Sequence, residues 1–281
     1  MRNVIVVYKK STWELKRNSS DERVREYIVS HPEAVARWME SDARQKSCLV
    51  RVISSLKSMD NVEFKTVYRA NLQEIDFNNY DCVVSVGGDG TFLETSHYLA
   101  GGIPLLGVNS DPYTSCGHFC STNELSFFNK FSKSLLKEIN YGRISLTIDG
   151  WEVPELSLNE VLICDENPAA VSQYRIGDDD FKSSGHLLAT YCGQTAFIHH
   201  AGGSKMEYER DGEIYEDRFI QGIPLVVKDA KPTYYEGKVG VLSKMRKGKI
   251  YIDGEHISYD FHMGSRLTCE INNNHKLSVL E

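Results

Sequence analysis

The five residues from Gly87 to Thr91 constrain this chain more than any others. They read Gly-Gly-Asp-Gly-Thr, directly follow the apolar run 82–86, and lead into a short helical stretch from Phe92 to Leu99. Glycines let main-chain N–H groups approach a phosphate closely, and a helix that starts there adds the positive end of its dipole. A carboxylate amid phosphates, here Asp89, is repelled unless it holds Mg²⁺ or takes a proton from an attacking hydroxyl. The motif therefore predicts phosphoryl transfer to an alcohol; the simpler alternative is a glycine-rich turn.

The composition is that of a globular protein, and it limits the partners. The formal net charge of the 281-residue chain is −7, which argues against general binding to nucleic acid or to an anionic membrane. No apolar run approaches the length of a membrane span, and the N-terminus enters a strand pattern without the apolar core of a signal peptide. We therefore expect no nucleic-acid partner, no membrane partner and a cytoplasmic location.

Seven cysteines are scattered along the chain, and an odd number within apolar patterns indicates reduced thiols. Cys116, His118 and Cys120 lie close enough in sequence to suggest a metal site. Zinc takes four ligands, commonly with a second pair elsewhere, and the sequence shows no second pair. We therefore favour packing and loop chemistry for these residues and assign no metal ligand.

The first half of the chain alternates strand and helix patterns. Apolar strand patterns occupy residues 4–8, 62–67, 82–86 and 103–108. Between the first two, Leu49, Val52, Ile53 and Leu56 recur at helical spacing. This alternation predicts a parallel sheet flanked by helices, with ligands beyond the carboxyl ends of the strands.

Two further segments of this half have helical character. An apolar stripe from Phe127 to Ile139 predicts a closing helix, with Ser126 as its cap and Gly142 as its stop. Residues 11–45 are rich in charge and read as a surface arm with helical pieces.

The second half has a different character. Strand patterns separated by Gly, Asn and Asp turns span residues 144–148, 156–164, 186–191, 238–243, 249–253 and 266–271. Few long helical patterns intervene, so we expect an antiparallel, sandwich-like β-rich domain. We place an α/β domain at 1–142 and the β-rich domain at 143–267, with 268–281 as a candidate for completing the first.

Four separated segments together resemble the NAD kinase family. They are residues 86–93 around the Gly-Gly-Asp-Gly-Thr motif, 104–109 followed by Gly117-His118, 158–161 with Asn159-Glu160, and 184–203. The motif alone is shared with lipid kinases, whereas the Asn-Glu pair and the Gly-x-Thr-Ala element are more specific. Residues 109–112, 168–172 and 182–185 resemble the divergent branch that includes mitochondrial NAD kinases and plant NADH kinases.

The resemblance implies a kinase that phosphorylates the adenosine 2′-hydroxyl of NAD⁺ or NADH, with Asp89 as the general base. A carboxylate within hydrogen-bond reach of a weak alcohol nucleophile suits that role. The residues implied to hold phosphate or nucleotide are Gly87, Gly88, Gly90, Thr91 and Phe92.

The same resemblance implies a dinucleotide site in the second half. Asn159 and Glu160 resemble the pair that binds adenosine, and Thr195 and Ala196 resemble the turn that contacts adenine. On the dipeptide alone, a solvated strand end is the favoured interpretation of Asn159-Glu160.

Lys182, Ser184 and His200 complete the implied dinucleotide-binding set. Most family members carry an acidic residue where this chain has Ser184, and a serine cannot favour a cationic nicotinamide as a carboxylate does, so tolerance of NADH is expected. Gln194 and Phe197 also depart from the family pattern. For His199 and His200, contact with ligand and a structural role both stay open.

The implied cofactors are ATP as the phosphoryl donor and Mg²⁺ bound with the nucleotide. The implied assembly is a homodimer or homotetramer, and the apolar stretch 220–227 would be core or contact surface. Three alternatives remain: a non-catalytic NAD(P)-binding sensor, a lipid kinase of the same motif, and a purely structural interaction protein. The intact Asp89 argues against the first, the Asn-Glu and Thr-Ala elements against the second, and the spaced glycine-rich motifs against the third.

Overall fold

The computed structural model describes residues 2–99, 101–205, 209–210, 213–214, 218–271 and 273–281. The chain divides into two compact units, one of residues 1–139 with 278–281 and one of residues 140–277. Of the segment 268–281, therefore, only the last four residues lie in the first unit.

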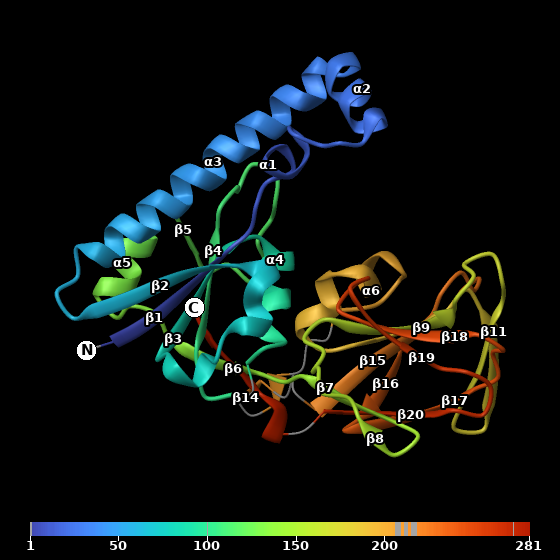
Figure 1. Cartoon of the computed structure of the whole chain (residues 1–281). Helices are drawn as coiled ribbons and strands as arrows, with labels where there is room; N and C mark the ends of the chain where they lie inside the picture. Colours follow the sequence, from blue (N-terminus) through green and yellow to red (C-terminus); the bar gives the residue numbers. More distant parts are fainter. Residues whose placement is uncertain (1, 100, 206–208, 211–212, 215–217, 272) are drawn as a thin grey trace. The chain divides into compact units, whose positions relative to one another are not determined.

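The strands of the first unit form one sheet in the order β2-β1-β3-β4-β21-β6, and β5 pairs with β4 (Figure 1). Their bounds are β1 Arg2–Tyr8, β2 Val62–Tyr68, β3 Cys82–Gly87, β4 Leu105–Asn109, β5 Thr122–Asn123, β6 Glu138–Tyr141 and β21 Leu277–Leu280. The pairs β1-β2, β1-β3, β3-β4, β4-β5 and β4-β21 are all parallel, which confirms the expected parallel sheet.

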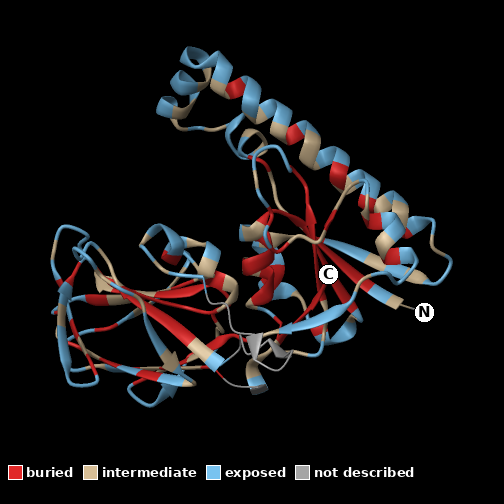
Figure 2. Cartoon of the chain, turned by 180° about the vertical axis from the view of Figure 1, so that it is seen from behind, coloured by how far each residue is buried: buried red, intermediate tan, exposed pale blue. Residues whose placement is uncertain are grey.

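Helices flank this sheet. They are α1 Thr12–Lys16, α2 Glu22–Ser30, α3 Pro32–Lys57, α4 Asp89–Ser96 and α5 Phe127–Ser132. Cys48, Val52 and Leu56 of α3 and the two buried phenylalanines of α5 pack on one face of the strands in a single core cluster. Strands β1, β3 and β4 are buried along most of their length, whereas β2 and β6 are largely exposed or half-buried (Figure 2). Two short 3₁₀ helices, Arg69–Glu74 and Phe77–Asn79, connect β2 to β3.

The charged arm at 11–45 is more regular than the sequence suggested. Its second half, from Pro32 onward, is the start of the 26-residue helix α3, which begins well before the apolar positions that revealed it. Asp42 replaces an apolar residue on the buried side of this helix, where its carboxylate binds Ser11 and Lys46. Because this buried carboxylate interrupts the apolar periodicity, the sequence pattern did not reveal the first three turns of α3.

The expected closing helix from Phe127 to Ile139 is wrong in its length. Helix α5 ends at Ser132, and Ser134 adopts a left-handed φ of 51° that no helix continues. Leu135 is exposed, and the chain then turns into β6 at the sheet edge, so Gly142 stops no helix. Pairing with the sheet outweighs the helical spacing of these apolar residues.

The second unit contains two six-stranded antiparallel sheets. The first comprises β7 Ile144–Ile148, β8 Trp151–Glu152, β10 Ser172–Ile176, β11 Asp179–Ser183, β17 Lys238–Ser243 and β20 Arg266–Ile271. The second comprises β9 Glu160–Asp165, β12 His186–Ala189, β15 Phe219–Pro224, β16 Thr233–Glu236, β18 Gly248–Ile252 and β19 Ile257–Asp260. One short helix, α6 Phe197–His200, follows a turn at Cys192–Thr195, and β13 Glu209–Arg210 pairs with β14 Glu213–Ile214.

Side chains from both sheets share one core cluster. Leu146 and Tyr174 of the first sheet pack with Val161, Leu188 and Ile250 of the second. Two sheets that bury alternate residues against each other form a sandwich, which confirms the predicted architecture. The stretch 220–227 divides: Ile220 and Ile223 are buried in β15, and Val226 is almost fully exposed.

Candidate functional site

The Gly-Gly-Asp-Gly-Thr loop joins the end of β3 to the start of α4 at the carboxyl edge of the parallel sheet. None of its three glycines has a left-handed φ, so close packing and not backbone strain explains the first two. A Cβ on Gly87 would collide with the Thr91 side chain, and one on Gly88 would lie 2.8 Å from Ser115 Oγ. A Cβ on Gly90 would meet nothing within 4 Å. The fold does not require a glycine at position 90, and the open space above it suits a phosphate.

Asp89 is the first residue of α4 and is partly exposed. Its Oδ1 accepts a hydrogen bond from the N–H of Phe119 at 2.9 Å, which fixes the direction of the carboxylate. The loop that supplies this N–H is itself tied to the motif, because Ser110 N–H donates to Gly87 O at 2.8 Å. An oriented, partly exposed carboxylate beside an open glycine can accept a proton from a bound hydroxyl.

Thr91 and Phe92 differ in what they offer a ligand. The Thr91 hydroxyl is buried and has no hydrogen-bond partner in the part of the chain that the structure describes. The Phe92 ring is fully buried and stacks on Phe119 at a centroid distance of 5.1 Å, and its N–H donates to Gly88 O. We therefore assign Phe92 to packing, whereas Thr91 keeps an unused donor.

In the second unit, the Asn159-Glu160 pair stands at the start of β9 and is held by one carboxylate that sequence reasoning missed. Asp253 Oδ1 accepts hydrogen bonds from Ser157 Oγ at 2.7 Å, from Asn159 N at 2.8 Å and from Glu160 N at 3.0 Å. Its Oδ2 accepts from Leu158 N at 2.8 Å. Asp253 thus orients four consecutive residues. The only sequence signal was the turn pair Asp253-Gly254 after a strand.

Asn159 and Glu160 are both buried, yet Asn159 Oδ1 and Glu160 Oε2 have no hydrogen-bond partner among the described residues. Buried polar atoms are normally satisfied, so two adjacent exceptions mark a place for a ligand. Burial, helped by the nearby Asp253 carboxylate, raises the pKa of Glu160 to about 8. A carboxyl group with that pKa both donates and accepts hydrogen bonds near neutral pH.

A cavity of about 340 Å³ opens beside Glu160. Its walls are Leu162, Phe197, Tyr251, Gly254 and Glu255. Mostly apolar walls with two carboxyl groups, those of Glu160 and Glu255, suit a flat ring that carries polar edges.

The predicted turn at Thr195 and Ala196 lies against the same strand end. A Cβ on Gly193 would collide with the carbonyl of Asn159, so the glycine lets the turn reach the Asn159-Glu160 backbone. Thr195 itself is exposed, and Ala196 N–H closes the turn onto Gly193 O at 2.9 Å. The structure therefore brings together Asn159, Glu160 and this turn.

Of the remaining predicted residues, Lys182 and Ser184 lie further away within the unit. Ala189 pairs with Glu160, and His186 pairs with Ile163, so Ser184 lies past the opposite end of β12. Lys182 and Ser184 are exposed there. His200 is exposed in α6, with its ring centroid 5.7 Å from that of His199.

No group of three or more His, Cys, Asp or Glu side chains suited to a metal ion occurs among the described residues. Burial raises the pKa of Cys120 to about 12, so this thiol stays protonated at neutral pH. All seven cysteines are free thiols. Within the described residues, no helix is long and apolar enough to cross a membrane.

Comparisons with known proteins find NAD kinase relatives of this chain. Residues 6–125 match the model of the ATP-NAD kinase N-terminal domain. A probable NADH kinase of rice is 28% identical over 273 residues, which cover 85% of this chain and 82% of the relative. The rat mitochondrial NAD kinase 2 is 24% identical over 73% of this chain, which spans about half (52%) of that relative.

The fold has a counterpart among solved structures. The crystal structure of an NAD kinase from Archaeoglobus fulgidus in complex with ATP superposes with a TM-score of 0.64 at 21% identity, covering 99% of this chain and 93% of that chain. The resemblance to NAD kinases, including the branch with plant NADH kinases and mitochondrial enzymes, is confirmed.

The raised pKa of Glu160 predicts a pH effect on stability. The folded state favours the protonated group, so its contribution is complete below the ordinary value of 4.5 and is lost as the pH rises through about 8. We expect Glu160→Gln to remove this dependence and to raise the melting temperature relative to the native chain at pH 8. Calorimetry across that range measures it, with the exposed Glu255 replaced by Gln as the control. Parallel curves for native chain and Glu160→Gln would contradict the assignment.

The Asp253 hydrogen bonds predict a large cost for Asp253→Ala. Each buried N–H left unsatisfied costs ~1–3 kcal/mol, and Asp253 serves three buried residues. Asp149→Ala is the matched control, because Asp149 also has a left-handed φ but accepts from a single exposed backbone N–H, that of Arg266, besides the Ser265 side chain. Urea unfolding should show a loss for Asp253→Ala several times that for Asp149→Ala; equal losses would remove Asp253 from its positioning role.

Proposed function

We propose that this chain, whose N-terminal unit carries the ATP-NAD kinase domain, phosphorylates the adenosine 2′-hydroxyl of NAD⁺ or NADH to give NADP⁺ or NADPH. The observation that carries the proposal is the pair of buried, unpartnered oxygens on Asn159 and Glu160 in the second unit. These two oxygens would be satisfied by a ligand that carries both hydrogen-bond donors and acceptors, as adenosine does. The open loop at Asp89 in the first unit supplies the phosphoryl-transfer half.

The first unit provides the base and the phosphate contacts. Asp89, fixed by the Phe119 N–H, takes the proton of the 2′-hydroxyl as that oxygen attacks the terminal phosphorus of ATP, the bond from this phosphorus to the bridging oxygen breaks, and ADP leaves. The open face of Gly90 and the buried Thr91 hydroxyl are the groups available to phosphate. Phosphoryl transfer needs little covalent chemistry from the protein, so positioning and charge neutralisation dominate.

The second unit holds the dinucleotide. Asn159 and Glu160 bind the adenosine, with the Thr195-Ala196 turn beside them. Lys182, Ser184 and His200 are exposed and available to the rest of a dinucleotide. The uncharged Ser184 gives no electrostatic preference for the cationic nicotinamide, which supports use of NADH as well as NAD⁺.

Mg²⁺ fits this arrangement as an ion that arrives with the nucleotide. In proteins Mg²⁺ is usually bound by one or two carboxylates together with substrate phosphates, and Asp89 is a carboxylate placed at the open loop. Bound there, the ion would neutralise phosphate charge. The described residues gather no separate cluster of metal ligands.

The two enzymatic and binding alternatives fit less well. A lipid kinase would leave the polar Asn159-Glu160 pair without a partner, and a non-catalytic sensor would not need the oriented Asp89. A cytoplasmic location and a homo-oligomer, dimer or tetramer, belong to the proposal.

Asp89→Asn tests the chemistry. The amide keeps the size of the side chain but cannot take a proton, so we expect turnover of NAD⁺ and NADH to fall by ~10²–10⁴-fold. Dinucleotide affinity, measured by calorimetry, should change little. Asp21→Asn, at the cap of α2, is the control that should retain native turnover. Native turnover in Asp89→Asn would remove Asp89 from the base role.

The assembly is tested separately by light scattering. We expect a mass of at least twice that of the 31.9 kDa chain at micromolar concentration. The physical reason is that edge strands and open faces of β-rich domains are commonly covered by a symmetric copy. A monomer that still turns over NAD⁺ would exclude the oligomer.

A further inference from the structure

We propose that Lys9, directly after β1, binds the phosphate chain of the donor nucleotide and forms the wall of the phosphate site opposite the Gly-Gly-Asp-Gly-Thr loop. The inference rests on the proposed function, which it deepens by naming a residue of the donor subsite. Sequence reasoning passed over Lys9, because a lysine at the end of a strand usually faces solvent.

Strand register places Lys9 beside the loop. Tyr8 pairs with Tyr68 on one side and with Val86 on the other, so the next row across the sheet is Arg69, Lys9 and Gly87. The neighbouring pair Gly87 and Asn109 continues this row into β4. Four strands thus end level with one another at the carboxyl edge.

The strand order predicts a ligand-binding crevice between the ends of β1 and β3. The chain passes from β1 outward to β2 and then returns to the other side of β1 to form β3. In open parallel sheets, ligands bind where the strand order reverses, beyond the carboxyl ends. The reversal lies between β1 and β3, and Lys9 and Gly87 are the residues at its two sides.

The charge of Lys9 is unmatched within the described residues. No carboxylate lies within ion-pair distance of its ammonium there, and the nearby Asp111 is taken by Arg44 at 2.7 Å and by Thr114 at 2.7 Å. Burial, together with repulsion from Arg69, lowers the pKa of Lys9, and Asp111 and Cys120 only partly oppose this. A partly buried cation without a counter-charge is stabilised by an anionic ligand.

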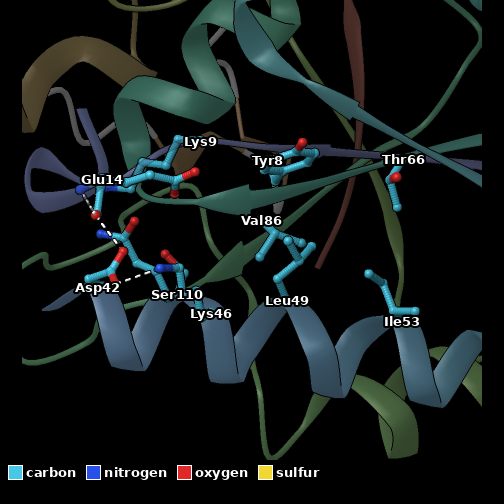
Figure 3. A pocket seen from close by; sticks show the side chains of 12 residues that line it. Tyr8, Lys9, Glu14, Asp42, Lys46, Leu49, Ile53, Thr66, Val86 and Ser110 are labelled. Carbon is cyan, nitrogen blue, oxygen red and sulfur yellow. Dashed lines mark hydrogen bonds and ion pairs between the residues drawn. The ribbon is translucent and has the colours of Figure 1, made fainter. Parts of the chain in front are cut away.

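The surroundings contain room and a spare donor. Lys9 and Ser110 line a cavity of about 260 Å³ between α3 and the sheet (Figure 3). The Ser110 hydroxyl is almost fully buried and has no partner among the described residues. The other cation at this cavity, Lys46, is already paired with Asp42 at 2.7 Å. Of the two lysines at this cavity, Lys9 is therefore the one without an ion pair among the described residues; the wall also carries the Glu14 carboxylate and that of Asp42, which Lys46 pairs.

The donor phosphates are the ligand that this geometry favours. Lys9 follows β1, and the buried Thr91 hydroxyl belongs to the loop and helix start that follow the neighbouring strand β3, where the transferred phosphate must approach. The pyrophosphate of the dinucleotide is the other source of the same chemistry, and the experiment separates the two.

The test compares Lys9→Met, which keeps the length of the side chain without its charge, with Lys9→Arg, which restores a charge. Lys10→Met is the matched control, because the Lys10 ammonium lies over the Tyr68 ring at 4.6 Å and not toward the loop. Calorimetry with Mg·ATP and, separately, with NAD⁺ gives both affinities, and thermal unfolding without ligand gives stability.

We expect Lys9→Met to weaken ATP binding by about 10- to 100-fold, as for loss of a charged hydrogen bond. NAD⁺ affinity should stay within about 2-fold, and Lys9→Arg should recover most of the ATP affinity. The melting temperature of Lys9→Met without ligand should equal or exceed that of the native chain, because an unpaired charge leaves a partly buried place. A residue with a structural role alone would lower it.

Several results would overturn the proposal. Native ATP affinity in Lys9→Met, an equal loss in Lys10→Met, or no ATP binding by the native chain would each do so. A loss confined to NAD⁺ would assign Lys9 to the dinucleotide. If the native chain binds ATP through Lys9 but forms no NADP⁺ or NADPH, the proposed function fails and the Lys9 site stands.

Discussion

The first unit depends on the level ends of its parallel strands. Because β2, β1, β3 and β4 pair in register, the residues that follow them share one edge of the sheet. That edge gathers Arg69, Lys9, the glycine loop and Ser110, which come from segments far apart in the chain. At this edge the Asp89 carboxylate is held by the Phe119 N–H, and the hydroxyls of Thr91 and Ser110 have no hydrogen-bond partner among the described residues.

In the second unit, a single side chain positions the candidate site residues. The Asp253 carboxylate holds four consecutive residues in place and also disfavours charge on the neighbouring Glu160. Asp253 therefore sets the backbone geometry of Asn159 and Glu160 and adds to the effect of burial on the protonation of Glu160. A sandwich core of branched and aromatic side chains supports this arrangement, since β9, β12 and β18 are buried on the side that faces the other sheet.

Much of this was predictable from the sequence, because it is local. The strand before the glycines, the parallel and antiparallel halves and the motif residues follow from periodicity, turn residues and resemblance. The features that the sequence did not predict depend on contacts with other segments of the chain. Asp42 interrupts the apolar stripe of α3 because Ser11 and Lys46 satisfy it, and residues 138–141 join β21 in spite of their helical spacing. Asp253 and Lys9 acquire their meaning only through residues that other strands bring beside them.

The open space above Gly90 shows that the glycines of this loop are needed for two different reasons, packing of the fold and room for a ligand. A methyl group at position 87 or 88 meets neighbouring side chains, so the folded state itself rejects it, whereas at position 90 the folded state is indifferent. Packing within the folded chain therefore does not explain a glycine at position 90, whereas a ligand that occupies the open space above it would. Screens that report only on folding would judge position 90 replaceable, and stable variants would accumulate there even if they blocked the proposed phosphate site.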